Sequence, residues 1–399
     1  MIVKGTGMIE EREEELCDLA DAIFDHPENG GEEFYASEQL CSYLKKNGFQ
    51  VEKGVGTLET AFRATFQNGE GGPVIGLLCE YDAVPGMGHA CGHHAQGPAV
   101  IGAAIALKET AAEKPFTLVV YGTPAEEGFG GKAVMLHAGC FSELDVALMC
   151  HGGATTTTDV KSLALSSYEV CFRGKASHAA IAPEEGRSAL DAALLMFQGI
   201  EFLREHVKDD TRMHYNLACS GESECTVPAF TKCKVTLRSY SRAYLDSVIA
   251  RFMKIVKGAE LMTETTAEVI HENSCDGKIP VLKLNQLLMK HAENHKAPCI
   301  RPSREKTGST DFGNIMYRIP GSCIRVAFVP EGTPSHSETF LKYGKHDSMH
   351  KAMITAAKIL EDTCRELIEK PDLMREIREE FKRNKRELEG EQNDEKVKI

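Results

Sequence analysis

The chain has 399 residues, of which 42% are hydrophobic and 26% are charged, and its formal net charge is −13. This composition is typical of a globular protein and excludes collagen-like and intrinsically disordered chains. The acidic balance disfavours binding to nucleic acid or to an anionic membrane surface. At roughly 150 residues per domain, the length predicts two or three domains.

The first residues and the cysteines predict a cytoplasmic protein. The chain begins MIVKGTGMIEEREEE, without the apolar stretch of a secretory signal. No segment approaches the run of about 18 apolar residues that a membrane helix needs. The 14 cysteines could form disulfides in a small secreted protein, but in a chain of this length we expect reduced thiols.

The first half of the chain predicts a sheet covered by helices. Apolar residues at helical spacing indicate two helices between residues 10 and 47, separated by the polar sequence HPENGGEE. Short apolar runs then predict strands at 74–79, 116–121 and 146–150, with a helix at 98–109 between the first two. This alternation is typical of an α/β domain.

The pattern changes near Ser162. Alternating apolar residues at 163–172 and 233–237 predict strands, and the segment 187–207 between them is expected to be a helix. We therefore expect a smaller α+β domain over 163–277. It would interrupt an α/β catalytic domain whose mixed central sheet is flanked by helices.

The catalytic domain is expected to resume after the insertion. A helix is predicted at 281–295, a strand at 323–329, and a long helix from Asp347 onwards. Beyond residue 370 charged residues dominate, which predicts a solvated helix or a frayed tail. The expected parts of the chain are therefore the catalytic domain (1–162 and 278–370), the inserted domain (163–277) and a charged tail (371–399).

The densest set of potential metal ligands follows the strand predicted at 74–79. His89, Cys91, His93 and His94 lie within six residues, and imidazole and thiolate are preferred ligands of zinc-like ions. Glycines among them allow the backbone to turn tightly enough for several side chains to reach one ion. The cluster favours a metal site over a Gly-rich turn with incidental polar residues.

Two more predicted strands end in groups that can bind metal. Glu126 and Glu127 follow the strand at 116–121, and His151 follows the strand at 146–150. Ligands of open α/β sheets bind at the carboxyl ends of strands, so one glutamate could bind a metal while the other takes a proton from water. Taken alone, the glutamates are better explained as surface carboxylates and the histidine as a structural residue. Their occurrence at successive strand ends favours a site.

Together the chain offers five ligands, Cys91, His93, Glu127, His151 and His336, and leaves Glu126 as a general base. Taken alone, His336 in PSHS is no more than a loop histidine. One catalytic zinc usually keeps about three protein ligands, so two ions roughly 3.5–4 Å apart suit five ligands better. Zn, Mn and Co all accept this donor set.

The order and spacing of these motifs resemble the M20 family of metallopeptidases and amidohydrolases, in the branch with a G-H-x-C-G-H motif. The similarity covers roughly residues 10–369 and includes EYDAVPGMGHACGHH, GTPAEEGFGGKAVML, RGKASHAAIAPEEG and PSHSETF. Within the family, the chain looks closest to the dipeptidase and aminobenzoyl-glutamate hydrolase members.

The resemblance implies that the five ligands bind two divalent ions and that Glu126 is the general base. It also implies that the inserted domain is a lid and dimerisation domain. His178 of that domain would stabilise the oxyanion in its own or in a partner's active site. Arg238 falls where relatives bind the substrate carboxylate, although an exposed strand arginine is an equal alternative. Gly308 and Ser309 would lie in a binding loop, although a helix cap also explains the polar residues there.

The chain departs from the family pattern at several positions. Many members have H-x-D where this chain has EYD at 80–82, so His93 would replace a missing ligand and Asp82 would orient a ligand. Cys225 stands where relatives often have asparagine, which leaves one substrate contact open. No role is assigned to Cys225, His89 or His94.

The predicted function is hydrolysis of the amide bond of a small dipeptide or of an N-acyl or N-aroyl amino acid with a free carboxylate. Metal-activated water would attack, with Glu126 as the base, in a homodimer formed through the lid. One alternative is an amidase with Cys91 as the nucleophile. Another is a non-catalytic binding protein that retains the fold.

Overall fold

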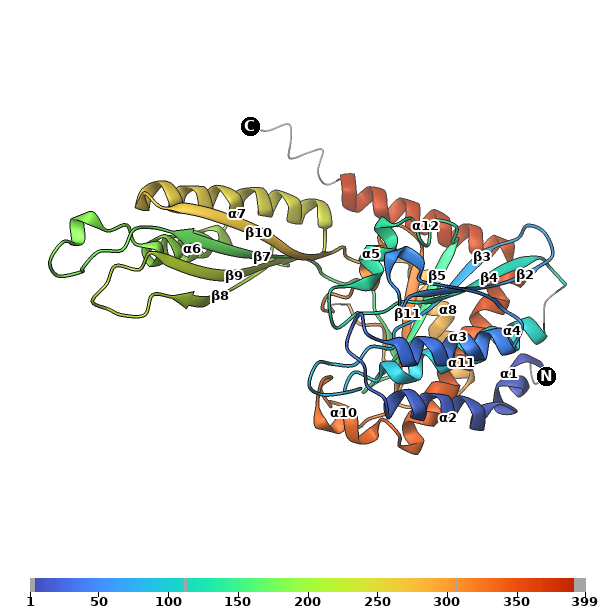
Figure 1. Ribbon diagram of the computed structural model, residues 1–399. Helices are drawn as coiled ribbons and strands as arrows, with labels where there is room; N and C mark the ends of the chain where they lie inside the picture. The colour runs from blue at the N-terminus through green and yellow to red at the C-terminus, as the bar shows by residue number, and fades with distance from the viewer. Residues whose placement is uncertain (1–3, 111–112, 306, 391–399) are drawn as a thin grey trace. The chain divides into compact units, whose positions relative to one another are not determined.

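The computed structural model describes residues 4–110, 113–305 and 307–390. The chain divides into two compact units. Within the described part of the chain, the first comprises residues 4–161 and 278–385, and the second comprises residues 162–277 and 386–390. Each unit contains its own β-sheet (Figure 1).

The first unit is built on a seven-stranded mixed sheet in the order β1-β2-β4-β3-β5-β11-β6. β3 pairs in parallel with β4 and β5, and β5 pairs in parallel with β11. β1, β2 and β6 add antiparallel pairings at the two sides. The strands are β1 (Gln50–Lys53), β2 (Phe62–Asn68), β3 (Val74–Cys79), β4 (Phe116–Gly122), β5 (Val146–Gly153), β6 (Thr157–Thr158) and β11 (Gly321–Ala327).

Helices cover both faces of this sheet. On one face, Met149 of β5 packs in a cluster with residues of α5 and α9. On the other face, the neighbouring Cys150 lies beside α4 and α11, because successive side chains of a strand point to opposite faces. The helices of this unit are α1 (Lys4–Glu10), α2 (Glu13–Phe24), α3 (Phe34–Lys46), α4 (Gln96–Glu109), α5 (Gly131–His137), α8 (Leu282–Asn294), α9 (Phe312–Met316), α10 (Glu338–Tyr343), α11 (Asp347–Glu369) and α12 (Pro371–Gly390).

Helix α4 lies at the centre of the helical layer and is buried on all sides. Every residue from Gln96 to Leu107 is buried, which is the expected position of a helix that is apolar around its whole circumference. Its glycines allow close packing, because a Cβ at Gly97 would lie 2.6 Å from a methyl group of Leu40 and one at Gly102 would lie 2.8 Å from a methyl group of Leu16. The close packing of α4 thereby fixes the position of the preceding loop, which contains Cys91 and His93.

The second unit has a four-stranded antiparallel sheet in the order β10-β7-β9-β8. Two helices pack on it and share an apolar core with its strands, so the unit is of the α+β type that the sequence predicts. Its elements are β7 (Ala164–Arg173), α6 (Ala189–Arg204), β8 (Arg212–Ser220), β9 (Phe230–Ser239), α7 (Arg242–Thr263) and β10 (Thr266–Cys275). The predicted fold class, a mixed α/β sheet interrupted by a smaller α+β insertion, is confirmed.

The charged segment from residue 371 forms helix α12 as far as Gly390. It differs from a fully solvated helix or tail because Met374, Ile377 and Phe381 are buried. In addition, the carboxylate of Glu380 accepts the backbone N–H groups at the start of α8. Residues 391–399 lie outside the described part of the chain. None of the described helices is long and apolar enough to cross a membrane.

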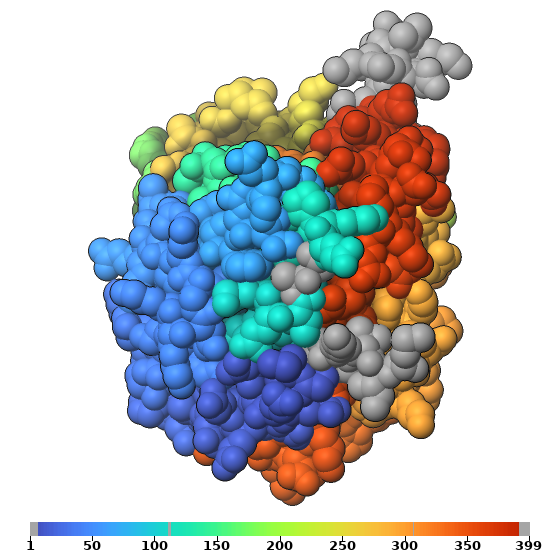
Figure 2. Space-filling model, turned by 90° about the vertical axis from the view of Figure 1, so that its right-hand side faces the viewer, coloured from blue at the N-terminus to red at the C-terminus, as the bar shows by residue number. Residues whose placement is uncertain are grey.

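At the amino ends of β3 and β4, Lys114 and Pro115 lie beside Pro371 and Met374 of α12. Figure 2 shows this side of the molecule. A hollow of about 340 Å³ here has an apolar floor that includes Leu367 and Met374. Its two cations already have partners. Lys114 donates to the carbonyl of Glu369 (2.6 Å) and Arg378 pairs with Asp145 (2.6 Å). The candidate ligands gather at the opposite end of these strands.

Lys278 is a buried lysine at the start of the second segment of the first unit. Its ammonium donates to the carbonyl of Asp159 (2.7 Å), to Oδ1 of Asn285 (2.9 Å) and to Oγ of Ser322 (3.2 Å). Burial lowers the pKa of Lys278 to about 8, whereas an unfolded lysine has a pKa of about 10.4. The unfolded chain therefore binds more protons between these pH values, and the free energy of unfolding rises with pH in this window.

Replacing Lys278 with methionine should remove this pH-dependent contribution. We expect the difference in unfolding free energy, wild type minus Lys278→Met, to increase by about 2 kcal/mol between pH 7 and pH 9.5. Denaturant titrations of both proteins at the two pH values measure this difference. The same difference at both pH values would show that Lys278 does not titrate in this window.

Candidate metal centre and active site

The loops after the parallel strands converge at one edge of the first sheet. β3, β4 and β5 are parallel neighbours, so their carboxyl ends meet there. The loop after β3 carries Cys91 and His93, the loop after β4 carries Glu126 and Glu127, and His151 lies near the end of β5. The fold thus brings together residues far apart in the sequence.

Two groups of potential ligands share one residue. Cys91, His93 and His151 place one ligand atom each within 4.8 Å of one another, and Cys91, Glu127 and His336 do the same. Cys91 thus belongs to both groups. The Sγ atom of Cys91 lies 3.6 Å from Nε2 of His151, and Oε1 of Glu127 lies 2.8 Å from Nε2 of His336. All five ligands predicted from the sequence lie in these two groups.

The donor set fits a borderline cation such as zinc. It combines one thiol, three imidazoles and a carboxylate, all common zinc ligands. Nε2 of His93 is buried and has no hydrogen-bond partner among the described residues, although it lies 3.3 Å from Oε2 of Glu80. A buried polar atom without a partner is costly, and coordination to a cation would satisfy it.

Burial shifts the protonation of two candidate ligands. It raises the pKa of the Cys91 thiol to about 11 and lowers the pKa of His151 to about 3. Without a cation nearby, Cys91 is therefore a thiol and His151 a neutral imidazole. A nucleophilic cysteine needs the thiolate. His151, 3.6 Å away, is not a positive charge that could stabilise one, and the neighbouring His93 lowers the pKa of the Cys91 thiol but does not outweigh the effect of burial.

Excess negative charge dominates the rest of the site. Burial, together with the neighbouring carboxylates of Glu80 and Asp311, raises the pKa of Glu126 to about 8. Burial opposes protonation of His93, but Cys91 and Glu80 raise its pKa well above the usual range. Both raised pKa values mean that this part of the site binds positive charge readily. The charge can be supplied by protons or by metal ions.

Asp82 links the ligand loops after β3 and β4. Its buried carboxylate places Oδ1 3.1 Å from Nδ1 of His93 and accepts the backbone N–H of Glu127 at Oδ2 (2.8 Å). One side chain thus orients the imidazole of His93 and fixes the backbone that carries Glu127. These are the contacts of a carboxylate that orients metal ligands.

A second buried carboxylate, Glu33, holds the turn that precedes Glu126. Its Oε1 accepts the backbone N–H of Ala125 (2.8 Å) and its Oε2 accepts the hydroxyl of Thr60 (2.8 Å). Ala125 has φ of 62°, a left-handed conformation that is unfavourable for a residue with a Cβ. The sequence does not indicate this role, because Glu33 belongs to the polar run HPENGGEE and nothing local distinguishes a buried glutamate there.

Replacing Glu33 with alanine should lower the free energy of unfolding by about 1–3 kcal/mol, because it leaves the buried N–H of Ala125 without an acceptor. Glutamine keeps an acceptor oxygen, so Glu33→Gln should lose less stability. Chemical denaturation of the two variants measures the difference. Equal stability of wild type and Glu33→Ala would contradict this role.

His89 and His94 are structural histidines. Nε2 of His89 lies 3.1 Å from the carbonyl of Ile23, and Nε2 of His94 lies 2.9 Å from the carbonyl of Gly344. Both rings are buried, which lowers the pKa of His89 to about 4 and that of His94 to about 3. As neutral rings they tie the ligand loop to the last turn of α2 and to the residue that follows α10.

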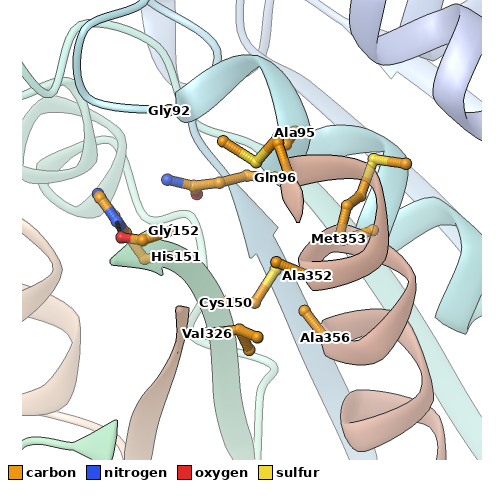
Figure 3. A pocket seen from close by; sticks show the side chains of 12 residues that line it. Gly92, Ala95, Gln96, Cys150, His151, Gly152, Val326, Ala352, Met353 and Ala356 are labelled. Carbon is orange, nitrogen blue, oxygen red and sulfur yellow. Dashed lines mark hydrogen bonds between the residues drawn. The ribbon is translucent and has the colours of Figure 1, made fainter. Parts of the chain in front are cut away.

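A small cavity of about 20 Å³ lies next to His151. Figure 3 shows the side chains of His151 and Gln96 pointing away from Met353 and helix α11, which line the opposite wall. The volume suffices for about one water molecule. The cavity is therefore too small for a substrate.

The remaining predicted site residues lie elsewhere in the chain. Gly308 and Ser309 lie in the loop before α9. His178 and Arg238 belong to the second unit. His178 is exposed and forms a bridge with Thr226, while Arg238 lies on β9.

The exposed Cys225 accompanies His178 on the neighbouring loop. The carbonyl of Cys225 accepts the backbone N–H of Ala179 (2.9 Å). Through this hydrogen bond, the backbone of Cys225 supports the loop that carries His178. No substrate contact is assigned to its side chain.

Residues 76–364 match the sequence profile of peptidase family M20/M25/M40. The chain belongs to this family. Two M20 relatives support the assignment over nearly their whole length. A p-aminobenzoyl-glutamate hydrolase polypeptide of Escherichia coli (strain K12) is 32% identical, over 93% of each chain. The Xaa-Arg dipeptidase of Homo sapiens is also 32% identical, over 94% of this chain and 90% of the relative.

The chain is therefore an M20 enzyme that hydrolyses amide or peptide bonds, and the alternative of a non-catalytic binding protein is not supported. Solved structures show the same fold. An aminobenzoyl-glutamate utilization protein of Klebsiella pneumoniae matches with a TM-score of 0.66 at 20% identity, covering 89% of this chain and 98% of the other. A dinuclear metal binding peptidase of the M20 family from Bacillus subtilis matches with a TM-score of 0.67 at 18% identity, covering 87% and 98%.

Proposed function

We propose that this M20 enzyme is a dinuclear metallohydrolase in which Cys91, His93, Glu127, His151 and His336 hold two divalent ions, Zn, Mn or Co. The observation that carries the proposal is the pair of ligand groups that share Cys91 at the carboxyl ends of the parallel strands. The description of the Bacillus subtilis relative as a dinuclear metal binding peptidase supports it.

Two divalent ions, when bound, lower the pKa of water and polarise a carbonyl group. Glu126 is the general base. It takes a proton from the attacking water and returns it to the leaving amine, for which a pKa near neutrality is best suited. In the absence of the ions, burial and the carboxylates of Glu80 and Asp311 raise the pKa of Glu126 above that of an ordinary glutamate, which makes it a stronger base. The neighbouring Glu127 binds metal in this proposal. Asp82 accepts the backbone N–H of Glu127 and so fixes its position relative to Glu126.

Four further residues bind the substrate in this proposal. His178 of the lid donates to the oxyanion, and Arg238 binds the substrate carboxylate through its planar guanidinium. Gly308 and Ser309 contribute the loop before α9. The substrate is a small dipeptide or an N-acyl or N-aroyl amino acid with a free carboxylate. The names of the relatives, a hydrolase of p-aminobenzoyl-glutamate and a dipeptidase, support this class.

The second unit mediates homodimerisation in this proposal. β8 is an edge strand, and its Tyr215 and Leu217 are exposed. Helix α6 packs along it, with Phe197 stacked on Tyr215, and exposes Leu194 and Phe202. An apolar edge strand is prone to pair with another chain unless it is protected. A second copy of the same unit would cover this surface.

Replacing Leu217 with lysine should weaken the dimer, because a charge on the edge strand opposes pairing. We expect sedimentation velocity to show a dimer for the wild type and a shift towards monomer for Leu217→Lys. Leu261→Lys, on α7, is the matched control and should remain dimeric. A wild-type protein that is monomeric at all concentrations would refute the dimer.

We propose a reducing cytoplasm as the location of the enzyme. The 14 cysteines all lie in the described part of the chain, and none forms a disulfide. Disulfides are rare in that compartment, which agrees with this pattern.

The function is tested by elemental analysis of the purified protein together with a substrate panel. We expect about two divalent ions per chain and hydrolysis of at least one dipeptide or N-acyl amino acid. Matched substrates that lack the free carboxylate should react more slowly, and Arg238→Lys should reduce this preference. A protein with no divalent ions and no amidase activity would refute the proposal.

A further inference from the structure

Lys132, on α5, is a charged side chain without exposed surface. Its ammonium donates to Oε1 of Glu80 (2.6 Å) and to Oδ1 of Asp311 (2.7 Å). Its backbone N–H donates to Oδ2 of Asp311 (3.1 Å). Burying a charge costs several kcal/mol unless it is well paired, so these contacts amount to a built site for one positive charge.

The site is a pocket of three carboxylates. Glu80, Glu126 and Asp311 each place one oxygen within 4.8 Å of the other two. Calcium binds carboxylate oxygens at about 2.3–2.6 Å, so three oxygens at this spacing could hold a hard cation. The ammonium of Lys132 already donates to two of the three carboxylates. The ammonium of Lys132 therefore occupies the position that a hard cation bound by these carboxylates would take.

The pocket adjoins the candidate metal centre. Glu126 also forms a group with His93 and Glu127, and Oε2 of Glu80 lies 3.3 Å from Nε2 of His93. Gln96 holds Glu80 from the side of α4, where its side-chain amide donates to Oε2 of Glu80 (2.7 Å) and accepts the backbone N–H of Glu80 (3.1 Å). Without a charge in the pocket, Glu80 and Glu126 would be additional ligands for any ion beside His93.

We propose that Lys132 is a positioning residue whose ammonium permanently fills the pocket of Glu80, Glu126 and Asp311, so that no further divalent ion enters it and Glu126 stays available as a base. The role of Glu126 rests on the proposed function, whereas the occupancy of the pocket does not. Burial opposes the charge of Lys132, but Asp311, Glu80 and Glu126 raise its pKa, so the ammonium persists.

The test replaces Lys132 with methionine and uses Ca²⁺ as the probe. All three pocket ligands are oxygens, which calcium prefers, whereas the cysteine and histidines of the metal centre favour softer ions. Isothermal titration should show one Ca²⁺ more per chain in Lys132→Met than in the wild type. Adding Glu80→Gln to this variant should abolish the gain, because it removes one of the three charges.

Lys278→Met is the matched control. Lys278 is also buried in the first unit, but its ammonium donates to a carbonyl, an amide and a hydroxyl oxygen. This variant should gain no Ca²⁺. If the proposed function is wrong, the wild type should contain no Zn, Mn or Co. That result would not change the comparison of Ca²⁺ binding between the variants.

Folding of Lys132→Met is followed by circular dichroism with and without Ca²⁺. Folding that requires or is stabilised by Ca²⁺ supports the inference, because an ion then replaces the ammonium. A variant that folds and binds no more Ca²⁺ than the wild type overturns it. A variant that stays unfolded in both conditions overturns it as well, since a cation should be able to substitute for Lys132.

Discussion

Replacing Glu126 with glutamine should lower kcat by about 10²- to 10⁴-fold, the range that general acid–base catalysis contributes. Glutamine has nearly the same shape but cannot take a proton from the attacking water or return it to the leaving amine. The metal content should not change, because Glu126 is not one of the five proposed ligands. Steady-state kinetics and elemental analysis of the same preparation measure both quantities.

Stability provides an internal control for this variant. Burial and the carboxylates of Glu80 and Asp311 raise the pKa of Glu126, so the fold disfavours its charge. A neutral glutamine should therefore leave the free energy of unfolding of the metal-free protein unchanged or increase it. Glu127→Gln is the matched comparison, which should lose metal as well as activity. Near-normal kcat in Glu126→Gln would remove Glu126 from the role of base.

Removing the divalent ions with a chelator should abolish hydrolysis, and adding Zn, Mn or Co should restore it. The reason is that the metal-free site has no group that activates water strongly. Glu126 can accept a proton, but it cannot polarise the carbonyl, and Cys91 is a thiol of pKa about 11. Activity before chelation, after chelation and after metal addition is the measurement.

Alkylation separates this mechanism from a cysteine nucleophile. Cys91 is buried, at 7% exposure, and metal coordination would protect it further. Cys219 and Cys225 are exposed and should react first, so the experiment uses a variant with serine at both positions. We expect the metal-loaded variant to keep its activity under alkylation. Activity that survives chelation and is lost on alkylation would instead support the thiol mechanism.

The sequence predicts the buried strands well and the exposed strands poorly. The run at 74–79 matches β3, because a strand covered on both faces consists of consecutive apolar residues. In contrast, β8 is missed although Met213, Tyr215 and Leu217 alternate with polar residues, because most residues of this strand are exposed and its alternation does not mark one face of a core. β1 and β10, most of whose residues are also exposed, are missed as well.

The candidate metal ligands could also be predicted from the sequence, whereas the buried charged residues that support them could not. Cys91 and Glu127 follow parallel strands and His151 lies near the end of a third, so their convergence could be predicted, because the carboxyl ends of such strands meet at one edge of the sheet. Glu33 and Lys132 could not be predicted. Their burial depends on partners far away in the sequence, such as Ala125 for Glu33 and Asp311 for Lys132. Nothing in the local sequence separates a buried charge of this kind from a solvated one.

The pairing of β11 with β5 across the inserted unit has a consequence for folding during synthesis. The segment Ser162–Gly277 is contiguous and has its own apolar core, so it can fold as soon as it leaves the ribosome. The sheet of the first unit must wait for β11, because a contact between distant segments forms slowly. Until then the edge of β5 is open, and the nascent chain is most prone to aggregate.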